Sequence, residues 1–504
     1  MTVKIKSGTV SDLKGIVVDV EIEILRGLPS FNIVGLADQS IRESKERIKA
    51  AIINSGYKFP LGKIIVNLAP ANVKKMGSVL DLPMAIGILA ASSQISADHL
   101  EDFLIAGELS LGGEVKEIKG LFPILQEGIS KGINKFIIPR ENQYQSNFFC
   151  KGEIYLMESL RNTINYLLYR DQLPSEKANY IFENSSELNL DDVVGQEGVL
   201  RAIEVSAGGF HNIALYGSPG AGKTLIAKKM QGLLPGMSYE EIMEVFKIYS
   251  MTDNPKDLFE SLKRPFRSPH HSCSSVSLIG GVKGTIGEVT LAHNGILFLD
   301  EFLLFKRECI EELREPLESR EIHISKSTAQ ICLPAKFLLV LAFNPCPCGN
   351  YLSLYKKCYC TEGERTRYLN KISKPILDRV DIFTYVPRVE IKSVNAKNKN
   401  ELSKSICSNI KFAVEIQRER YSKSKEKYNG LVSTKDLINN LNIEKEALEK
   451  LYLLYDKLGL TMRGYYKILR IARTIADLQR NEKLDKDHIY EAINYRRFMS
   501  REVI

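Results

Sequence analysis

No stretch of the 504-residue sequence approaches the roughly 18 consecutive apolar residues that a membrane-spanning helix requires. The longest apolar runs, such as Phe337 to Phe343, have only the length of a buried strand. The first residues also lack the apolar stretch that is typical of a secretory signal. These absences argue against a membrane-embedded or secreted protein, so we expect a cytoplasmic chain with no membrane partner.

The sequence also lacks a strong excess of charge and any internal repeat of fixed period. Its 69 lysines and arginines exceed its 61 aspartates and glutamates by only 8, a balance that permits nucleic-acid binding without demonstrating it. Hydrophobic residues make up 44% and charged residues 26%, which is ordinary for a globular chain. The length predicts a multidomain protein of roughly three folding units.

We expect three units and one linker. Residues 1–170 alternate β-rich runs with helical patterns, which indicates an α/β or α+β domain. Residues 171–189 are polar and read as a linker. Residues 190–390 alternate apolar strands with helical segments, as a parallel sheet with crossover helices requires, and residues 391–504 become lysine-rich and then amphipathic and helical. The predicted fold class is α/β multidomain. The expected strands of the second unit are Ile213 to Tyr216, Ile296 to Leu299 and Phe337 to Phe343.

A glycine-rich loop lies between a predicted strand and a predicted helix in the second unit. Such a loop lets backbone N–H groups at a helix N-terminus surround a phosphate chain. Lys223 can then reach the β- and γ-phosphates, and the Thr224 hydroxyl can bind Mg²⁺. The sequence therefore predicts an ATP-binding P-loop formed by Gly217, Ser218, Pro219, Gly220, Ala221, Gly222, Lys223 and Thr224.

Two carboxylates follow the predicted strand Ile296 to Leu299. We expect Asp300 to hold the metal and Glu301 to orient the attacking water, because phosphoryl transfer is catalysed chiefly by positioning and electrostatics. A strand that ends in Asp-Glu is common by itself, but it is a strong signal after a complete P-loop. Asn344 ends the next strand and either positions water beside the γ-phosphate or has no catalytic role.

The nine cysteines are not expected to form a disulfide framework in a reducing compartment. Five are scattered and are best interpreted as core residues. The other four lie within fifteen residues, directly after Asn344. Four thiolates suit a tetrahedral Zn²⁺, although the pairs are Cys-x-Cys rather than the more familiar Cys-x2-Cys, and buried redox-inert thiols are the alternative. The predicted ligands are Cys346, Cys348, Cys358 and Cys360.

Further motifs carry a family resemblance that covers nearly the whole chain. They are Arg264 to His271 (Arg-Pro-Phe-Arg-Ser-Pro-His-His), Leu291 to Glu301, Leu313 to Glu318 (Leu-Arg-Glu-Pro-Leu-Glu), Asn344 to Gly349 and Arg463-Gly-Tyr with Arg470 to Ala476. The chain resembles magnesium-chelatase-like AAA+ proteins of the YifB/ComM type. That resemblance implies a P-loop AAA+ core with a helix-2 insert and a pre-sensor hairpin, a C-terminal helical lid of the magnesium-chelatase type, and homohexameric rings with ATP sites between subunits.

The resemblance also implies roles for two arginines. Arg379, within Leu377-Asp-Arg-Val-Asp381, resembles an arginine finger that acts on the neighbour's ATP, and its alternative is a surface ion pair with Asp378 or Asp381. Arg463 resembles the second sensor arginine, which couples the nucleotide state to the lid. A planar guanidinium suits both tasks because it pairs with phosphate oxygens in a fixed geometry. Arg470 is a less certain candidate that could simply brace the lid.

Lys223 and Asp300 lie 77 positions apart, which predicts an insertion in this unit that could contact a substrate. Lys283 is expected at a loop tip in it. Residues 322–333 read as a hairpin with Lys326 near its turn. Related AAA+ motors point such hairpins into the ring pore, where a lysine would meet DNA phosphate, although a loop lysine is usually only solvated.

Residues 1–170 resemble the Lon-type peptidase fold, also called S5-like, in segments such as Asn67 to Ala71 and Gly107 to Gly113. The catalytic serine and lysine of that family do not follow, because Val79 and Glu117 occupy their positions. Ser78 has no evident basic partner. The domain is therefore expected to be a non-catalytic scaffold or a DNA-guiding collar.

The leading functional prediction is an ATP-dependent hexameric DNA motor, a helicase or branch-migration enzyme of recombination or natural transformation, acting on branched or single-stranded DNA. The alternative is a magnesium-chelatase-like ATPase subunit that remodels a protein or a metal-insertion complex. Both need ATP and Mg²⁺. A nucleotide-dependent scaffold without turnover would lack the catalytic carboxylate, whereas Glu301 is present.

Overall fold

The computed structural model describes residues 2–75, 77–149, 151–175, 196–253, 255–281, 285–325, 330–353, 356–388, 399–457 and 460–496. The chain folds into two compact units. Unit 1 comprises Met1–Phe182 together with Tyr239–Leu262, and unit 2 comprises Glu183–Ser238 together with Lys263–Ile504. Most of the expected linker, along with Lys283 and Lys326, lies outside the described residues. Among the described helices, none combines the length and the apolar character that crossing a bilayer demands.

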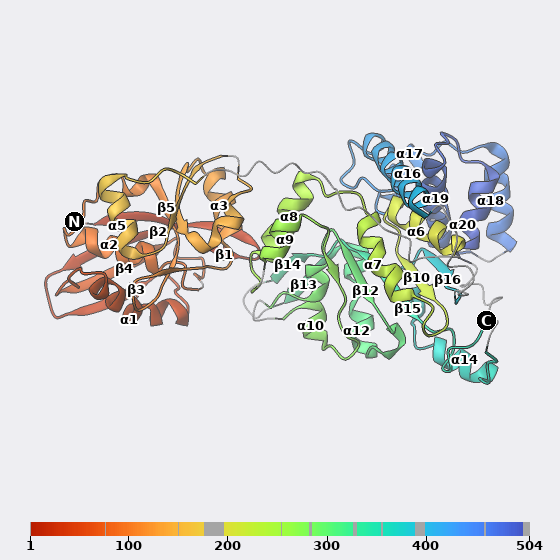
Figure 1. Cartoon of the computed structure of the whole chain (residues 1–504), viewed down its shortest axis with the longest axis horizontal. Helices are drawn as coiled ribbons and strands as arrows, with labels where there is room; N and C mark the ends of the chain where they lie inside the picture. The colour runs from red at the N-terminus through yellow and green to blue at the C-terminus, as the bar shows by residue number, and fades with distance from the viewer. Residues whose placement is uncertain are drawn as a thin grey trace. The chain divides into compact units, whose positions relative to one another are not determined.

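Unit 1 is built on a seven-stranded sheet with the order β3-β4-β2-β1-β5-β8-β9. The long strands β1 (Val3–Ser11) and β2 (Lys14–Leu25) pair antiparallel, as do β2 and β4 (Lys63–Ala69). The other neighbouring strands pair parallel, so the sheet is mixed. Helices α1 (Gln39–Asn54) and α2 (Asp81–Ala91) contact one another, and α2 packs on β2 (Figure 1). The remaining strands are β3 (Ser30–Val34), β5 (Phe103–Ile105), β8 (Lys135–Pro139) and β9 (Glu153–Met157). The expected alternation of β-rich runs with helical segments is observed.

Two helices from the insertion, α8 (Tyr239–Tyr249) and α9 (Lys256–Ser261), belong to unit 1. Phe246 of α8 is fully buried, and its ring lies 4.0 Å from Phe259, 4.4 Å from Phe148 and 5.6 Å from Phe122. Phe122 belongs to α3 (Leu121–Ser130), which also packs on β2. Segments far apart in the sequence therefore share one aromatic core.

Replacing Phe246 with alanine is expected to destabilise unit 1 by about 3–5 kcal/mol, because the change opens a cavity in this aromatic core. Denaturant unfolding followed by hydrogen exchange at the amides of unit 1 measures the effect. The matched control is Tyr239→Ala on the same helix, since the Tyr239 side chain is 50% exposed and therefore leaves no enclosed cavity on truncation. Equal effects of the two substitutions would show that Phe246 does not anchor the helix.

Unit 2 contains a five-stranded sheet with the order β11-β12-β15-β10-β16, in which all pairs are parallel. The central strands are β10 (Ile213–Tyr216), β12 (Ile296–Leu299) and β15 (Leu338–Phe343), as expected, and every residue in them is buried. The edges are β11 (Phe266–Arg267) and β16 (Ile382–Tyr385). Parallel strands present their carboxyl ends at one edge, so residues that follow β10, β12 and β15 meet there.

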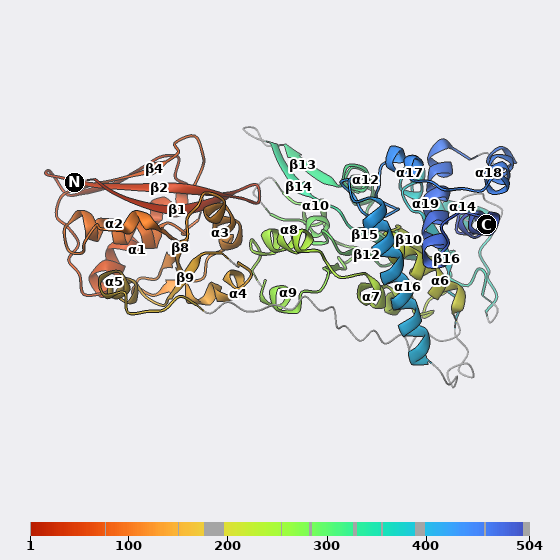
Figure 2. The same ribbon diagram turned by 90° about the horizontal axis from the view of Figure 1, so that it is seen from above.

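Helices α6 (Glu197–Gly209), α16 (Lys399–Arg420) and α19 (Met462–Leu478) contact one another in unit 2 (Figure 1). Helix α19 also packs against α20 (Lys486–Asn494), which in turn contacts α18 (Lys445–Lys457). The helical C-terminal segment is thus confirmed. The expected hairpin is also present, as β13 (Glu321–Ser325) paired with β14 (Gln330–Pro334), and forms a ribbon separate from the five-stranded sheet (Figure 2).

Candidate functional site

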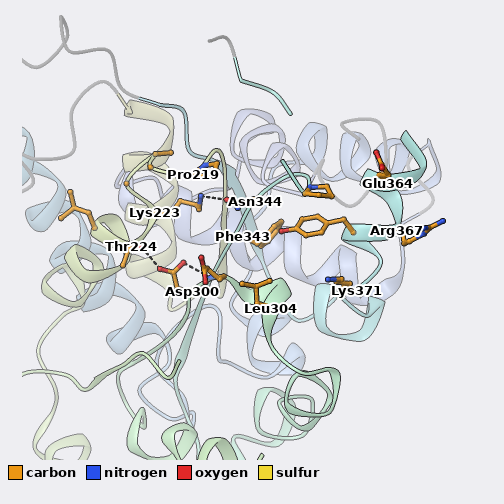
Figure 3. A pocket seen from close by; sticks show the side chains of 17 residues that line it. Pro219, Lys223, Thr224, Asp300, Leu304, Phe343, Asn344, Glu364, Arg367 and Lys371 are labelled. Atoms are coloured by element: carbon orange, nitrogen blue, oxygen red, sulfur yellow. Dashed lines mark hydrogen bonds between the residues drawn. The ribbon is translucent and has the colours of Figure 1, made fainter. Parts of the chain in front are cut away.

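A cavity of about 930 Å³ opens at the carboxyl edge of the unit 2 sheet (Figure 3). Its walls come from the loop after β10, from the residues that end β12 and β15, and from helix α14 (Glu362–Leu369). The lining therefore includes the predicted P-loop from Pro219 to Thr224 and both predicted carboxylates. Among the candidate site residues, it contains Pro219, Gly220, Ala221, Gly222, Lys223, Thr224, Asp300, Glu301 and Asn344.

Lys223 begins helix α7 (Lys223–Leu233), and its side chain folds back over the loop. The ammonium donates hydrogen bonds to the carbonyl oxygens of Gly217 at 2.8 Å and Ser218 at 3.0 Å, and to Asn344 Oδ1 at 3.1 Å. Burial lowers the pKa of this ammonium to about 8, and the negative charges of Asp300 and Glu301 oppose that shift. The lysine thus lies in a partly desolvated position where a phosphate would stabilise its charge.

The loop itself fits a phosphate chain. Gly220 and Gly222 have φ values of 76° and 89°, a region that side chains disfavour, and nothing lies within 4 Å of a Cβ built on either. Gly222 precedes α7 and supplies no side-chain cap, so the first N–H groups of that helix are left for another acceptor. The Ser218 hydroxyl is buried, with no hydrogen-bond partner among the described residues. These features form a cradle of donors suited to phosphate oxygens.

Asp300 and Glu301 follow β12 and line the cavity beside the P-loop. The Thr224 hydroxyl donates to Asp300 Oδ2 at 2.6 Å, which joins the two predicted Mg²⁺ ligands (Figure 3). Glu301 has a φ of 49°, a strained conformation for a residue with a side chain. Its carboxylate lies 3.4 Å from His271 Nδ1, a contact that the sequence analysis did not anticipate. A strained backbone therefore presents an acidic side chain at the cavity wall.

The four predicted zinc ligands lie together in the loop between β15 and α14. The Cys346 thiol is 3.4 Å from Cys348 and 3.7 Å from Cys358, and all four sulfur atoms lie within 4.8 Å of one another. A tetrahedral ZnS₄ site with 2.3 Å bonds has edges of roughly 3.8 Å. In the same loop, Gly349 has a φ of 75°, and a Cβ there would lie 2.5 Å from Pro219. The cysteine loop therefore packs directly on the P-loop.

Helix α14 closes the far side of the cavity from the P-loop and was not predicted as part of the site. It contributes Arg367 and Tyr368 to the lining, and Lys371 follows shortly after the helix. Figure 3 shows Arg367 and Lys371 on this side. The start of the helix is stabilised by a capping box between Thr361 and Glu364, immediately after the last cysteine. In the sequence, the only indication that this helix belongs to the site is that Arg367 and Lys371 follow soon after the cysteine cluster.

Arg379 and Arg463 are not among the residues that line this cavity. They meet instead at Glu318, which pairs with Arg379 and lies 3.1 Å from Arg463 Nη2. Arg379 also donates to the carbonyl oxygens of Arg314 at 3.1 Å and Pro375 at 2.7 Å. Its side chain is only 13% exposed. The structure therefore gathers both arginines away from this cavity of their own chain.

The alternative ion pairs expected for Arg379 are replaced by the pair with Glu318. Asp381 instead pairs with the buried Lys467 at 2.5 Å. Arg470 donates to the carbonyl oxygen of Val432 at 2.9 Å, a bracing contact within the helical segment. In unit 1, the Ser78 hydroxyl donates to the carboxylate of Glu108.

Comparison with known proteins adds a whole-chain result. Residues 189–394 match the family model described as magnesium chelatase, subunit ChlI, residues 400–496 match its C-terminal model, and residues 20–142 match a model described as subunit ChlI of Mg-chelatase. The competence protein ComM of Haemophilus influenzae is 36% identical over 488 residues, 95% of this chain and 94% of ComM. The chain belongs to the ComM/YifB family of magnesium-chelatase-like proteins. The YifB protein of Escherichia coli is 37% identical over 482 residues, again 95% of this chain and 94% of YifB.

Membership of the ComM/YifB family agrees with the geometry already described. Two of the family models match the parallel-sheet unit and the helical C-terminal segment. The P-loop, Asp300 and Asn344 all lie within the first of these two matches. The mixed α/β architecture with a parallel sheet is consistent with an AAA+ core. Such a core implies ATP and Mg²⁺ as ligands.

Proposed function

We propose that this chain is an ATP-driven DNA motor that works as a hexameric ring, with helicase or branch-migration activity in recombination or natural transformation. One observation carries the proposal: Lys223, Thr224, Asp300 and Asn344 converge through direct hydrogen bonds on one cavity. The relative named as a competence protein supports DNA rather than another substrate. The fold we assign is an AAA+ core with a helix-2 insert and pre-sensor hairpin, a Lon-like N-terminal domain and a helical lid.

Within one chain, each residue has a distinct task in ATP hydrolysis. Lys223 exchanges its carbonyl partners for phosphate oxygens, and the N–H groups at the start of α7 surround the phosphate chain. Thr224 and Asp300 would hold Mg²⁺, which neutralises charge on the β- and γ-phosphates when it is bound. Glu301 accepts a proton from the attacking water, which Asn344 helps to position.

The remaining half of the site comes from a neighbouring subunit. Glu318 holds Arg379 and Arg463 side by side, although neither reaches the cavity of its own chain. A head-to-tail ring places one surface of each subunit against a different surface of the next, so both arginines would face the neighbour's γ-phosphate. Hydrolysis then requires assembly.

We propose a structural zinc on the four cysteines. It would fix the loop that packs on Pro219 and leads into α14, so the metal would stabilise two walls of the cavity. Atomic absorption on protein prepared without chelator is expected to show zinc, and replacing Cys346 with serine removes one equivalent. The matched control is Cys407→Ser, since Cys407 lies outside the cluster. Equal zinc contents in the parent and Cys346→Ser would contradict the site.

DNA contacts are assigned to the pore side of the ring. Lys283 and Lys326, from the insert and the hairpin, would meet DNA phosphate, and the N-terminal domain would act as a non-catalytic collar. The Ser78 hydroxyl donates to the carboxylate of Glu108 rather than to a lysine, which supports a non-catalytic role for this domain, since a Ser-Lys dyad requires a lysine beside its serine.

The ATPase rate is expected to rise several-fold when branched DNA is added, and the stimulation should shrink at higher salt because phosphate contacts release counterions. The measurement compares branched, duplex and single-stranded DNA at two salt concentrations. Reversing the charge of Lys326 should reduce stimulation while leaving the DNA-free rate unchanged.

The competing function is a magnesium-chelatase-like subunit that remodels a protein or a metal-insertion complex, and the match to ChlI models favours it as the second candidate. The same assay separates the two. An ATPase that ignores every DNA and responds only to a porphyrin precursor with Mg²⁺ would replace the motor proposal.

A further inference from the structure

The β13–β14 hairpin has one buried face and one polar face. Ile322, Ile331 and Leu333 are each no more than 6% exposed, so they form its inner side. The alternation of a strand places Glu321 and His323 on the opposite side, and Cys332 stands directly across from His323 in the register. A thiol on the exposed side of a hairpin is unusual, because free cysteines are among the most buried residues.

The three polar side chains converge. The Cys332 thiol donates to Glu321 Oε2 at 3.3 Å, and His323 Nε2 lies 3.9 Å from the same oxygen. All three donor atoms lie within 4.8 Å of one another. Tetrahedral zinc with bonds of 2.0–2.3 Å separates its ligand atoms by roughly 3.3–3.8 Å, so small rotamer adjustments would bring this triad into coordination.

A fourth donor is close. Glu315, which directly precedes helix α13 (Pro316–Ser319), places Oε1 at 4.0 Å from His323 Nε2. One thiol, one imidazole and two carboxylates form a mixed set that suits Zn²⁺ better than the hard cations Mg²⁺ or Ca²⁺, which prefer oxygen alone. The set uses two strands and a turn that are separate from the four-cysteine loop.

We infer that Glu321, His323 and Cys332, with Glu315 as the fourth ligand, form a second zinc site that clasps the base of this hairpin. Binding converts the Cys332 thiol to a zinc-bound thiolate and releases its proton to solvent. The site joins β13, β14 and the turn before α13. It is independent of the ATP cavity and of the four-cysteine cluster, so it stands whether or not the proposed motor activity does.

Alkylation of Cys332 tests the site in the full-length chain, with zinc ion as the only probe. Iodoacetamide labelling is followed by peptide mass mapping, so Cys332 is scored separately from the four clustered cysteines. Zinc is expected to slow labelling of Cys332 by at least roughly tenfold, since coordination withdraws the nucleophilic thiolate. His323→Ala should abolish that protection, whereas His99→Ala, which changes an exposed histidine beside Asp102, should preserve it.

Zinc stoichiometry supplies the second readout. After equilibrium dialysis, Cys332→Ser is expected to bind one zinc fewer per chain than the parent protein, and His99→Ala to bind the same number. Unchanged labelling of Cys332 in the presence of zinc would overturn the inference. Protection that persists in His323→Ala would also overturn it, because a thiol alone would then account for the effect.

Discussion

Lys223→Ala is expected to lower the rate of ATP hydrolysis by roughly a hundredfold to a thousandfold, the cost of removing one donor that stabilises charge in a preorganised site. The substitution removes the only side-chain ammonium that touches both the P-loop carbonyls and Asn344 in the described structure. The cavity would retain its backbone donors and its carboxylates. Nucleotide binding should therefore weaken along with hydrolysis, because the phosphates would lose the positive charge of the Lys223 ammonium.

Steady-state ATPase assays and titration with a fluorescent ATP analogue measure the two effects. Lys228→Ala is the matched control, since Lys228 is an exposed lysine on the same helix and lies outside the cavity lining. Circular dichroism establishes that both variants remain folded. If Lys223→Ala hydrolysed ATP at the rate of the parent protein, the P-loop would not be part of the catalytic site.

The cavity residues that the sequence predicted are those whose spacing a short motif dictates. Lys223 and Thr224 follow β10 through a loop of defined geometry, and Asp300 and Asn344 each end a buried apolar strand. Parallel packing brings such strand ends together, so motif and topology lead to the same place. The four cysteines also converge because they lie close in the sequence.

The contacts that sequence reasoning missed depend on tertiary packing. Glu318 is the last residue of the Leu313 to Glu318 motif, but the sequence did not predict its ion pairs. Nothing in that segment indicates that Arg379 and Arg463 both contact it. His271 likewise reaches Glu301 from a different part of the chain.

The placement of helix α8 in unit 1 was equally hidden. Its apolar face, which includes Phe246, has the helical spacing of any amphipathic helix, and its partners Phe122 and Phe148 lie in a distant segment. Periodicity identifies a face that must be buried, but it does not identify the surface that buries it.

Arg379→Ala is expected to reduce ATP hydrolysis by roughly a thousandfold or more, the effect of losing an arginine that stabilises the transferring phosphate. ATP binding should change little, because Arg379 does not line the cavity of its own chain. The combination of retained binding and lost turnover distinguishes this variant from Lys223→Ala. Arg140→Ala is the matched control, since Arg140 is an exposed arginine that also pairs with a glutamate.

Mixing the two inactive variants decides whether Arg379 acts across a subunit interface. A site with an intact P-loop forms where an Arg379→Ala chain borders a Lys223→Ala chain that donates its normal Arg379. In random rings assembled head to tail from equal amounts, about a quarter of the interfaces have this arrangement, so measurable ATPase activity should return. If Arg379 only braced its own chain through Glu318 and the carbonyl oxygen of Pro375, no mixture would recover activity. Recovery of ATPase activity would therefore show that two subunits share one site. If no activity is recovered, Arg379 has only a structural role within its own chain.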